Sequence, residues 1–549
     1  MERIWHAVYG DRIAREIDLA GHTSVVAMEE AAMKKYAERT AFVSFMNRLT
    51  YADVDRLSAR FAAYLQGKLG VRKGDRVAIM APNLLAFPVA MFGLLRAGAV
   101  QVNVNPLYTP RELEHQLNDA GAETIVIFSG STPTLAAIRA NTRVKNVIVV
   151  DVGDCGQTPL PSPPVAPELN DYVKLADALA QGESMQFTPV AIEPEDLIFL
   201  QYTGGTTGVS KGAALSHRNL AANMLQLQAF APDLLRDGQE VVVTALPLYH
   251  IFALMVNLLS CFRAGATNVL VANPRDMDMF VKILKASRFS IITGVNTLFA
   301  GLMLHPEFKD IDFSNVRAAL GGGSAILKAT SEKWKSFTGQ HIREGYGMSE
   351  TSPVITFNPT FVDGFTETVG VPFPSTDVSL RDDQGKEVPL GQPGELCVKG
   401  PQVMRGYWGR MNENDTVFWP DGYLKTGDIA VCTPEGYFRI VDRKKDMILV
   451  SGFNVFPNEV EAVVAHCAGV AECACIGVPD EKTGEAVKVF ITRAPGAALT
   501  EQQVLEHCRN DLAAYKVPRH VEFRDALPKS VVGKILRREL RDADAGKPA

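Results

Sequence analysis

The stretch LQYTGGTTGVSKGAALSHRN, Leu200–Asn219, decides how the chain is interpreted, because glycines, threonines and a lysine crowd together behind a short apolar run. Glycines leave backbone N–H groups free of side-chain crowding, so that several can point into one concavity. Threonine hydroxyls add donors and Lys211 adds a positive charge. The pattern predicts a loop from Thr203 to Lys211 that holds the phosphates of ATP or a similar nucleotide.

Two other interpretations of this loop stay open. It is not a Walker A loop, which needs glycine before the lysine and a hydroxyl after it, whereas Ser210 precedes Lys211 and Gly212 follows. The segment GVSKG, 208–212, formally matches the GxSxG nucleophile elbow of α/β-hydrolases, which requires a strand directly before the serine and a helix directly after it. The strand-like run LIFLQY ends well before Ser210, which disfavours an elbow. A loop without a ligand is the third interpretation, so partners elsewhere in the chain must decide.

Length and composition limit the class of protein. A chain of 549 residues is too long for one compact core, so two or more domains are expected. Apolar residues make up 47% and charged residues 21%, and the net charge of -6 comes without long runs of either sign, so no nucleic-acid partner is indicated.

The compartment is predicted from the N-terminus and the cysteines. The first residues carry charges throughout and lack the apolar run of a signal peptide, and the eight cysteines include no CxxC pair. Both features favour a cytoplasmic protein with reduced thiols. No apolar run approaches the roughly 20 residues of a membrane span. Peripheral contact with the inner face of the membrane stays open, as does a homodimer.

The domain organisation follows from changes in texture along the chain. From Thr50 onward, β-rich apolar runs alternate with helical patterns, which predicts α/β layers with largely parallel sheets. Between about residues 369 and 440 short strands punctuated by Gly and Pro predict a small β-rich subdomain. The predicted fold is therefore α/β, with a large N-terminal domain over 1–442 that contains this subdomain, and a small α+β C-terminal domain over 443–549.

Four further segments accompany the loop: EGYGMSET (344–351), YLKTGD (423–428), DRKKDMILVSGFNVFPNEVE (442–461) and PKSVVGKILRREL (528–540). Together the five resemble, in order and over nearly the whole chain, the signature motifs of the acyl-adenylate-forming superfamily of acyl-CoA synthetases, luciferases and peptide-synthetase adenylation domains. Outside these motifs, NVNPLYTPRELEHQLNDAGA, ALPLYHIFAL, NPRDM and ITGVNTLF are most similar to the bacterial long-chain fatty-acid-CoA ligases.

The resemblance implies a two-step ligase that uses ATP, Mg²⁺ and coenzyme A. A fatty acid and ATP would give acyl-AMP and pyrophosphate, and coenzyme A would then give acyl-CoA and AMP. The implied catalytic residues are Lys534, His250, Glu350 and Thr206, of which Glu350 and Thr206 would hold the metal. The implied ATP-binding residues are Thr203, Gly204, Gly205, Thr206, Thr207, Gly208, Lys211, Gly322, Gly345, Tyr346, Gly347, Thr351, Asp428, Arg443 and Lys534.

The second step implies a mobile C-terminal domain. The resemblance places a hinge at Lys445 and a path for the thiol of coenzyme A along Ser451, Gly452 and Phe453. The apolar segments around His250 and Val295 would line the acyl pocket, with Phe252, Leu254, Val295, Leu298 and Phe299 facing the alkyl chain.

Several functions remain as alternatives to a long-chain ligase. A CoA ligase for medium-chain, dicarboxylic or aromatic acids would use the same motifs, and so would an acyl-AMP ligase that loads a carrier protein. A luciferase-like monooxygenase would share the adenylation step and add oxygen. A nucleotide sensor without activity is disfavoured because Lys211, Glu350, Asp428, Arg443 and Lys534 are all present.

Overall fold

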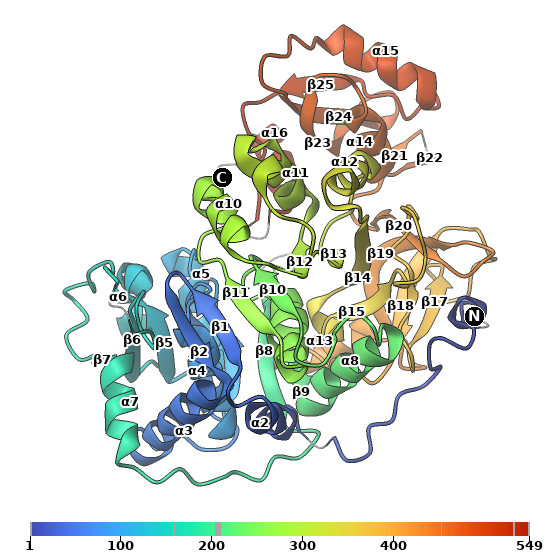
Figure 1. Ribbon diagram of the computed structural model, residues 1–549. Helices are drawn as coiled ribbons and strands as arrows, with labels where there is room; N and C mark the ends of the chain where they lie inside the picture. Colours follow the sequence, from blue (N-terminus) through green and yellow to red (C-terminus); the bar gives the residue numbers. More distant parts are fainter. Residues whose placement is uncertain are drawn as a thin grey trace.

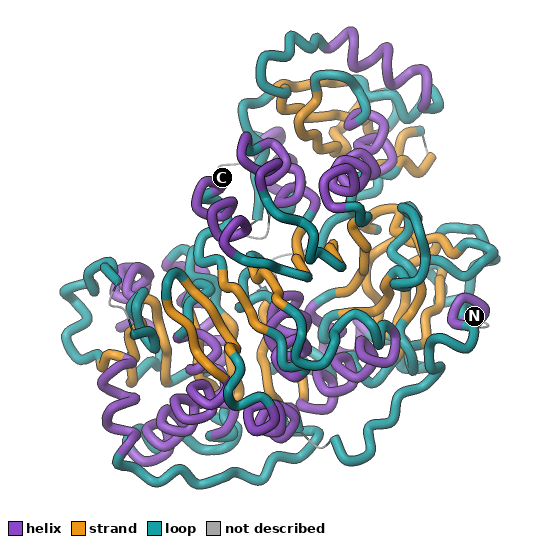
Figure 2. The backbone as a smooth tube through the Cα atoms, in the orientation of Figure 1, coloured by secondary structure: helices purple, strands orange, loops and turns teal. Residues whose placement is uncertain are grey.

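The structure is a computed structural model that describes residues 3–22, 24–157, 160–203, 210–451, 453–530 and 533–546. These residues form four sheets. In Figure 1 the two large sheets fill the lower part of the molecule, a β-rich sheet in orange lies beside them, and a C-terminal unit in red stands above. The tube in Figure 2 shows the same layers without side chains.

The seven-stranded sheet has the order β7-β6-β5-β3-β4-β8-β9. All its neighbouring strands run parallel except β8 and β9, which are antiparallel. Its strands are β3 (Arg76–Met80), β4 (Val100–Asn103), β5 (Thr124–Phe128), β6 (Asn146–Val150), β7 (Val173–Lys174), β8 (Leu197–Thr203) and β9 (Lys211–Ser216). Because a strand rather than a helix follows Ser210, the nucleophile elbow is excluded.

The nine-stranded sheet has the order β16-β15-β14-β13-β12-β10-β11-β1-β2 and is parallel from β14 through to β1. Its strands are β1 (Thr40–Ser44), β2 (Asn47–Thr50), β10 (Val241–Thr244), β11 (Thr267–Leu270), β12 (Ile291–Gly294), β13 (Ala318–Gly321), β14 (Ile342–Gly347), β15 (Val354–Phe357) and β16 (Val371–Pro372).

Helices cover both sheets. The helix α4 is apolar and buried along its whole length, as expected for a helix enclosed on all sides. The longer helices of this part are α2 (Val25–Lys35), α3 (Tyr51–Gly67), α4 (Ala86–Arg96), α5 (Pro110–Ala120), α7 (Leu175–Glu183), α8 (His217–Phe230), α10 (Met277–Ala286), α11 (Asn296–Leu304) and α12 (Lys328–Thr338). The shorter ones are α1 (His6–Tyr9), α6 (Thr132–Ala136), α9 (Cys261–Arg263) and α13 (Met411–Val417), with the helical turns η1 (Ser129–Ser131), η2 (Arg139–Asn141), η4 (Pro306–Asp310) and η5 (Ser349–Thr351) and the π-helix η3 (Ala253–Ser260).

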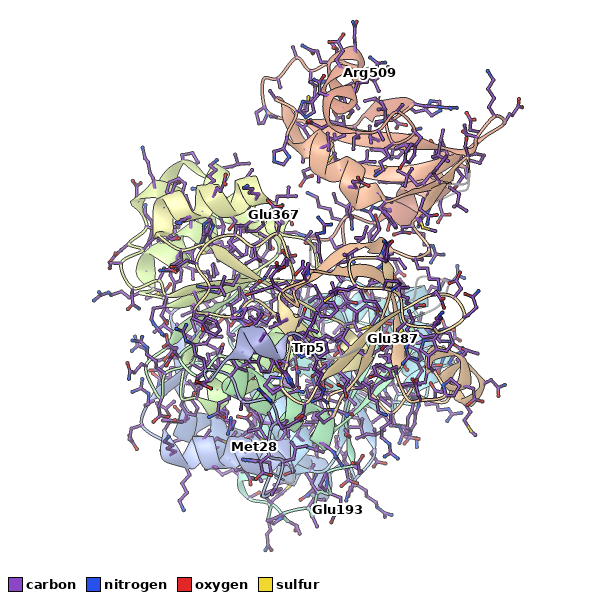
Figure 3. All side chains as sticks on the ribbon, turned by 90° about the vertical axis from the view of Figure 1, so that its right-hand side faces the viewer. Trp5, Met28, Glu193, Glu367, Glu387 and Arg509 are labelled. Atoms are coloured by element: carbon purple, nitrogen blue, oxygen red, sulfur yellow. The ribbon has the colours of Figure 1, made fainter. Side chains whose placement is uncertain are left out.

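The β-rich sheet is antiparallel, in the order β17 (Asp377–Arg381), β18 (Gly394–Lys399), β19 (Leu424–Cys432) and β20 (Phe438–Arg443). The N-terminal segment packs onto it. The Trp5 ring lies 5.9 Å from the Phe438 ring, and a Cβ atom on Gly436 would come within 2.7 Å of the Trp5 backbone. Figure 3 shows Trp5 beside these strands.

The C-terminal unit has its own sheet and its own core. Its strands are β21 (Ile448–Val450), β22 (Phe453–Val455), β23 (Val470–Asp480), β24 (Gly484–Arg493) and β25 (His520–Phe523), and its helices are α14 (Pro457–Ala465), α15 (Glu501–Asp511) and α16 (Arg537–Asp544). The predicted fold class is confirmed. The eight cysteines are free, and no helix in the described part of the chain is long and apolar enough to span a bilayer.

Candidate active site

Glycines bring three segments close together at the ends of the parallel strands. Gly322, just beyond β13, is buried, and a Cβ there would lie 3.2 Å from Cε1 of Phe252 and 3.3 Å from the carbonyl oxygen of Gly345. A Cβ on Gly347 would come within 2.0 Å of the carbonyl oxygen of Pro353. Larger residues would therefore push apart the β13 loop, β14 and the segment that leads into η3.

Tyr346, Asp428 and Arg443 form a hydrogen-bonded group between β14, β19 and β20. The Tyr346 hydroxyl donates to Oδ2 of Asp428 over 2.5 Å, and the Arg443 Nε lies 3.2 Å from Oδ1. Burial, helped by the nearby Asp428 carboxylate, raises the pKa of Tyr346. Asp428 therefore presents a fixed carboxylate, which suits the hydroxyls of a ribose.

Glu350 lies in η5 with its side chain almost fully buried. Its Oε1 accepts a hydrogen bond of 2.6 Å from the Tyr407 hydroxyl, and its backbone carbonyl accepts one from Met404 N–H. Burial raises the pKa of this carboxyl. A single buried carboxylate fits Mg²⁺, which is usually held by one or two carboxylates together with substrate phosphates.

The neighbouring Thr351, predicted to bind ATP, uses its hydroxyl within the turn, where it donates to the carbonyl oxygen of Met348 over 3.1 Å.

Lys534 reaches this group from the C-terminal unit. Burial and the nearby Arg443 lower the pKa of its ammonium to about 8, while the charge of Asp428 opposes the shift. Burial, together with the nearby charge of Lys534, lowers the pKa of His250 to about 4. The Phe252 N–H donates to Nδ1 of His250 over 3.3 Å, so the neutral ring carries its proton on Nε2. The structure thus unites Lys534, His250, Tyr346, Asp428, Arg443 and Glu350 at one centre.

The two ends of the Gly/Thr-rich loop are paired directly across β8 and β9, Thr203 with Lys211. The loop residues Gly204, Gly205, Thr206, Thr207 and Gly208 lie outside the described residues. The Lys211 ammonium forms an ion pair with Glu413 of α13 and lies 5.5 Å from the centre of the Tyr407 ring.

The predicted hinge residue lies two positions after Arg443, and the residues predicted for the thiol path lie on the β21–β22 hairpin. Lys445 is exposed in the turn between β20 and β21. Ser451 and Phe453 flank the tip of the β21–β22 hairpin, where Phe453 is 58% exposed and stacks near Tyr515, and Gly452 lies outside the described residues. In Figure 1 this hairpin and α16, which follows Lys534, lie on different sides of the C-terminal unit.

The five residues predicted to line the acyl pocket divide into two groups. Phe252, Leu298 and Val295 lie near the centre or at the edge of the core, and Val295 approaches both Gly323 and Gly533. Leu254 and Phe299 are fully buried, and the Phe299 ring packs edge-on against Trp334 at 4.9 Å. Burial alone does not distinguish a pocket lining from the core, so all five residues stay predicted lining residues.

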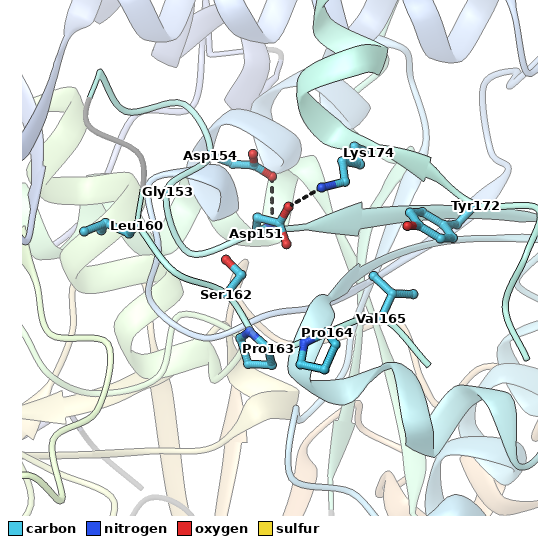
Figure 4. A pocket seen from close by; sticks show the side chains of 10 residues that line it. All are labelled: Asp151, Gly153, Asp154, Leu160, Ser162, Pro163, Pro164, Val165, Tyr172 and Lys174. Carbon is cyan, nitrogen blue, oxygen red and sulfur yellow. Dashed lines mark hydrogen bonds and ion pairs between the residues drawn. The ribbon is translucent and has the colours of Figure 1, made fainter. Parts of the chain in front are cut away.

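One cavity in the described part of the chain lies away from this centre. It measures about 470 Å³ at the β6–β7 edge of the seven-stranded sheet (Figure 4). Its polar groups satisfy one another: Lys174 pairs with Asp151, and Ser162 accepts from Val152 N–H. None of its lining residues belongs to the nucleotide motifs.

Sequence reasoning missed Tyr407, Glu413 and Glu344. Glu344 is buried behind the β13 loop, where its Oε1 accepts from Ile326 N–H over 3.2 Å and burial raises its pKa to about 8. An acidic residue directly before GYG was the available signal for Glu344. For Tyr407 and Glu413 the sequence offers none, because their contacts depend on the pairing of residues 405–408 with β9, which places α13 beside Lys211.

The fixed Asp428 carboxylate, the buried Glu350 carboxylate and Lys534 from the C-terminal unit form the arrangement that is expected of an adenylate-forming enzyme. The chain belongs to the AMP-binding enzyme family, which it matches over residues 28–408, with the AMP-binding enzyme C-terminal domain over residues 459–534. The resemblance inferred from the five motifs is thereby confirmed.

Named relatives share the whole length of the chain. It is 50% identical to a long-chain-fatty-acid–CoA ligase of Escherichia coli O6:H1, covering 100% of this chain and 99% of the relative, and 51% identical to one of Yersinia pestis, covering 99% and 98%. Among solved structures, the anthranilate CoA ligase AuaEII in complex with anthranoyl-AMP is similar with a TM-score of 0.85 and 27% identity, covering 95% of this chain and 97% of that one.

Proposed function

We propose that this chain is an ATP-dependent long-chain fatty-acid–CoA ligase that forms an acyl-adenylate and then an acyl-CoA. One observation carries the proposal. Lys534, from the last motif, lies within electrostatic reach of His250, Asp428 and Arg443, although these residues come from three different parts of the chain. The high identity to long-chain-fatty-acid–CoA ligases over the full length supports the substrate class.

In the first step the fatty carboxylate attacks the α-phosphate of ATP and pyrophosphate leaves. Two anionic groups must approach each other, so the site has to supply positive charge. The Lys534 ammonium bridges the carboxylate and the α-phosphate, assisted by Arg443. At about 4 Å and an effective dielectric near 20, one charge pair is worth about 4 kcal/mol. At about 1.4 kcal/mol per decade this allows roughly a thousandfold in rate.

The nucleotide is oriented by side chains that the fold already fixes. The adenine stacks on the Tyr346 ring, and the ribose hydroxyls donate to Asp428. Thr203, Lys211 and the loop between them hold the β- and γ-phosphates. Glu350 and Thr206 would hold Mg²⁺, which would supply positive charge that neutralises the phosphates. Tyr407 keeps the Glu350 carboxylate oriented.

In the second step the thiol of coenzyme A attacks the acyl-adenylate carbonyl and AMP leaves. Lys534 has to withdraw first, because it occupies the face through which the thiol arrives. The C-terminal unit rotates about Lys445 and brings the β21–β22 hairpin with Ser451 and Phe453 to the site. His250, neutral with its proton on Nε2, positions the acid and later the thioester carbonyl.

The test measures AMP release from ATP and coenzyme A with acids from acetate through octanoate and dicarboxylates to palmitate, oleate and a cinnamate. We expect a maximum at the long chains, with stoichiometric acyl-CoA. Activity confined to short, aromatic or dicarboxylic acids would leave adenylation intact and overturn the chain length. AMP without acyl-CoA would indicate a carrier-protein or luciferase-like function, and no AMP with any acid would refute the proposal.

A further inference from the structure

A backbone segment distant in sequence holds a short helix against the lysine of the phosphate loop. The Ala214 N–H donates to the carbonyl oxygen of Gly406 over 3.0 Å, and the Trp408 N–H donates to that of Gly212 over 2.8 Å. The segment therefore runs along β9 as an additional short strand pairing, and α13 begins directly after it. This pairing fixes where the side chains of α13 lie relative to Lys211.

Lys211 has an acidic partner where the nucleotide phosphates are expected. Its ammonium pairs with Oε2 of Glu413 and lies above the Tyr407 ring, whose hydroxyl donates to Glu350. A chain of contacts thus leads from Glu413 through Lys211 and Tyr407 to the proposed metal carboxylate. Glu413 and the phosphates of ATP would compete for the same ammonium, because both are anions that need it as a counter-charge.

Glu413 also has a second cation, and that cation is anchored. Its Oε1 lies 3.6 Å from Nη1 of Arg410, while Nη2 of Arg410 pairs with Oδ1 of Asp119 at 2.8 Å. Asp119 in turn accepts a hydrogen bond of 2.7 Å from the Tyr202 hydroxyl. Lys211 can therefore move to a phosphate while Glu413 keeps Arg410, which it shares with Asp119, as a neighbouring cation. Of the two contacts of Glu413, the one with Lys211 is therefore the one that a phosphate can replace.

We propose that Glu413 is a displaceable counter-ion for Lys211. The β- and γ-phosphates of ATP have to replace Glu413 at the lysine, and Glu413 pairs with the lysine again when pyrophosphate leaves. The inference rests on the proposed function, in which Lys211 binds these phosphates. Glu413 acts here as a positioning residue that weakens triphosphate binding and favours pyrophosphate release. The Lys211 and Glu413 side chains are 26% and 35% exposed, so solvent screens the pair and its effect is modest.

The test titrates the full chain with α,β-methylene-ATP and Mg²⁺ in a calorimeter, which reports binding without turnover. We expect Glu413→Gln to lower the Kd about two- to fivefold, the range of a partly exposed ion pair. The matched control is Asp415→Asn, which removes the same charge from an exposed position of the same helix. It should leave the Kd unchanged. The inhibition constant of pyrophosphate should fall in Glu413→Gln by a similar factor.

The same substitution made in a Lys211→Met variant separates an effect of Glu413 through Lys211 from a general effect of its negative charge on nucleotide binding. In Lys211→Met, the further change Glu413→Gln should leave the Kd unaltered, because the partner through which Glu413 acts is gone. A Kd for Glu413→Gln that equals or exceeds that of the wild type would overturn the inference while leaving the ligase intact. An equal effect of Glu413→Gln with and without Lys211 would overturn it as well. Absence of analogue binding by the wild type would instead refute nucleotide binding itself, and with it the proposed function.

Discussion

The Thr297 hydroxyl donates a hydrogen bond of 3.2 Å to the carbonyl oxygen of Gly533, which joins α11 of the large domain to the residue directly before Lys534. Gly533 has φ +80°, and a Cβ there would lie 2.7 Å from Oγ1 of Thr297. We expect this contact to hold Lys534 in the orientation that the proposed first half-reaction needs.

Gly533→Ala should therefore impair adenylation selectively. A left-handed backbone together with the clash costs about 1 to 3 kcal/mol, which corresponds to roughly a five- to hundredfold lower rate of acyl-AMP formation. Thioester formation from supplied acyl-AMP, which does not need this docking, should change far less. Thr297→Val serves as a milder control. Equal losses in both half-reactions would show that the glycine matters for folding rather than for docking.

Lys534→Ala should reduce the rate of adenylation by about a thousandfold, the value of one charge pair in a partly shielded site. Pyrophosphate exchange that depends on a fatty acid measures this step directly. The melting temperature should stay within a few degrees of the wild type, because the Lys534 side chain forms no ion pair with another of the described residues. A loss of less than tenfold would contradict the bridging role.

The pH dependence of adenylation should report the same lysine. Its pKa of about 8 leaves it charged at pH 7 and neutral above pH 9, so kcat/KM for adenylation should fall about tenfold per pH unit above pH 8. In Lys534→Arg the guanidinium stays charged, so the fall of kcat/KM above pH 8 should disappear, although the maximal kcat/KM should be lower than in the wild type. His250 should add no limb between pH 5 and pH 8, since its pKa lies near 4. An unchanged limb in Lys534→Arg would assign it to another group.

Tyr407→Phe removes the hydroxyl that donates to Glu350 but keeps the ring beneath Lys211. Loss of a hydrogen bond that orients a metal ligand typically costs about 10- to 100-fold in metal affinity. We therefore expect a higher Mg²⁺ concentration for half-maximal adenylation, with little change in the KM for the fatty acid. A Mg²⁺ titration of both proteins at saturating ATP decides the matter. Superimposable Mg²⁺ titration curves would show that Tyr407 does not support the metal site.

Glu344 should make the fold less stable as pH rises. Burial raises the pKa of its carboxyl to about 8, while the unfolded chain ionises near its ordinary value of 4.5, so its contribution is fully present below pH 4.5 and is lost as pH rises through about 8. Glu344→Gln keeps an oxygen for the Ile326 N–H and removes this dependence. The melting temperature of the variant minus that of the wild type should rise steadily from pH 5 to pH 8.5. A constant difference would show that Glu344 titrates normally.

Local patterns predicted the parts of this site that the chain builds from contiguous residues. The ends of β8 and β9, the carboxylate of Asp428 and the turn with Glu350 all follow from short motifs. Apolar composition, by contrast, does not distinguish a side chain that lines an acyl pocket from one that fills the core, because both environments favour the same side chains, so Phe252 and Phe299 stay predictions. Glu413 and Tyr407 escaped prediction for a different reason: only the long-range pairing of residues 405–408 with β9 brings them to Lys211.

The contact between Trp5 and the β-rich sheet bears on how the chain is made. Trp5 is fully buried against Phe438 and Gly436, and the Tyr9 hydroxyl donates to the carbonyl oxygen of Pro372. During synthesis the first helix leaves the ribosome long before these partners exist. Its large apolar rings stay exposed to chaperones and proteases until β20 has emerged, so completion of the large domain is a late event that closes the two ends of its sequence onto each other.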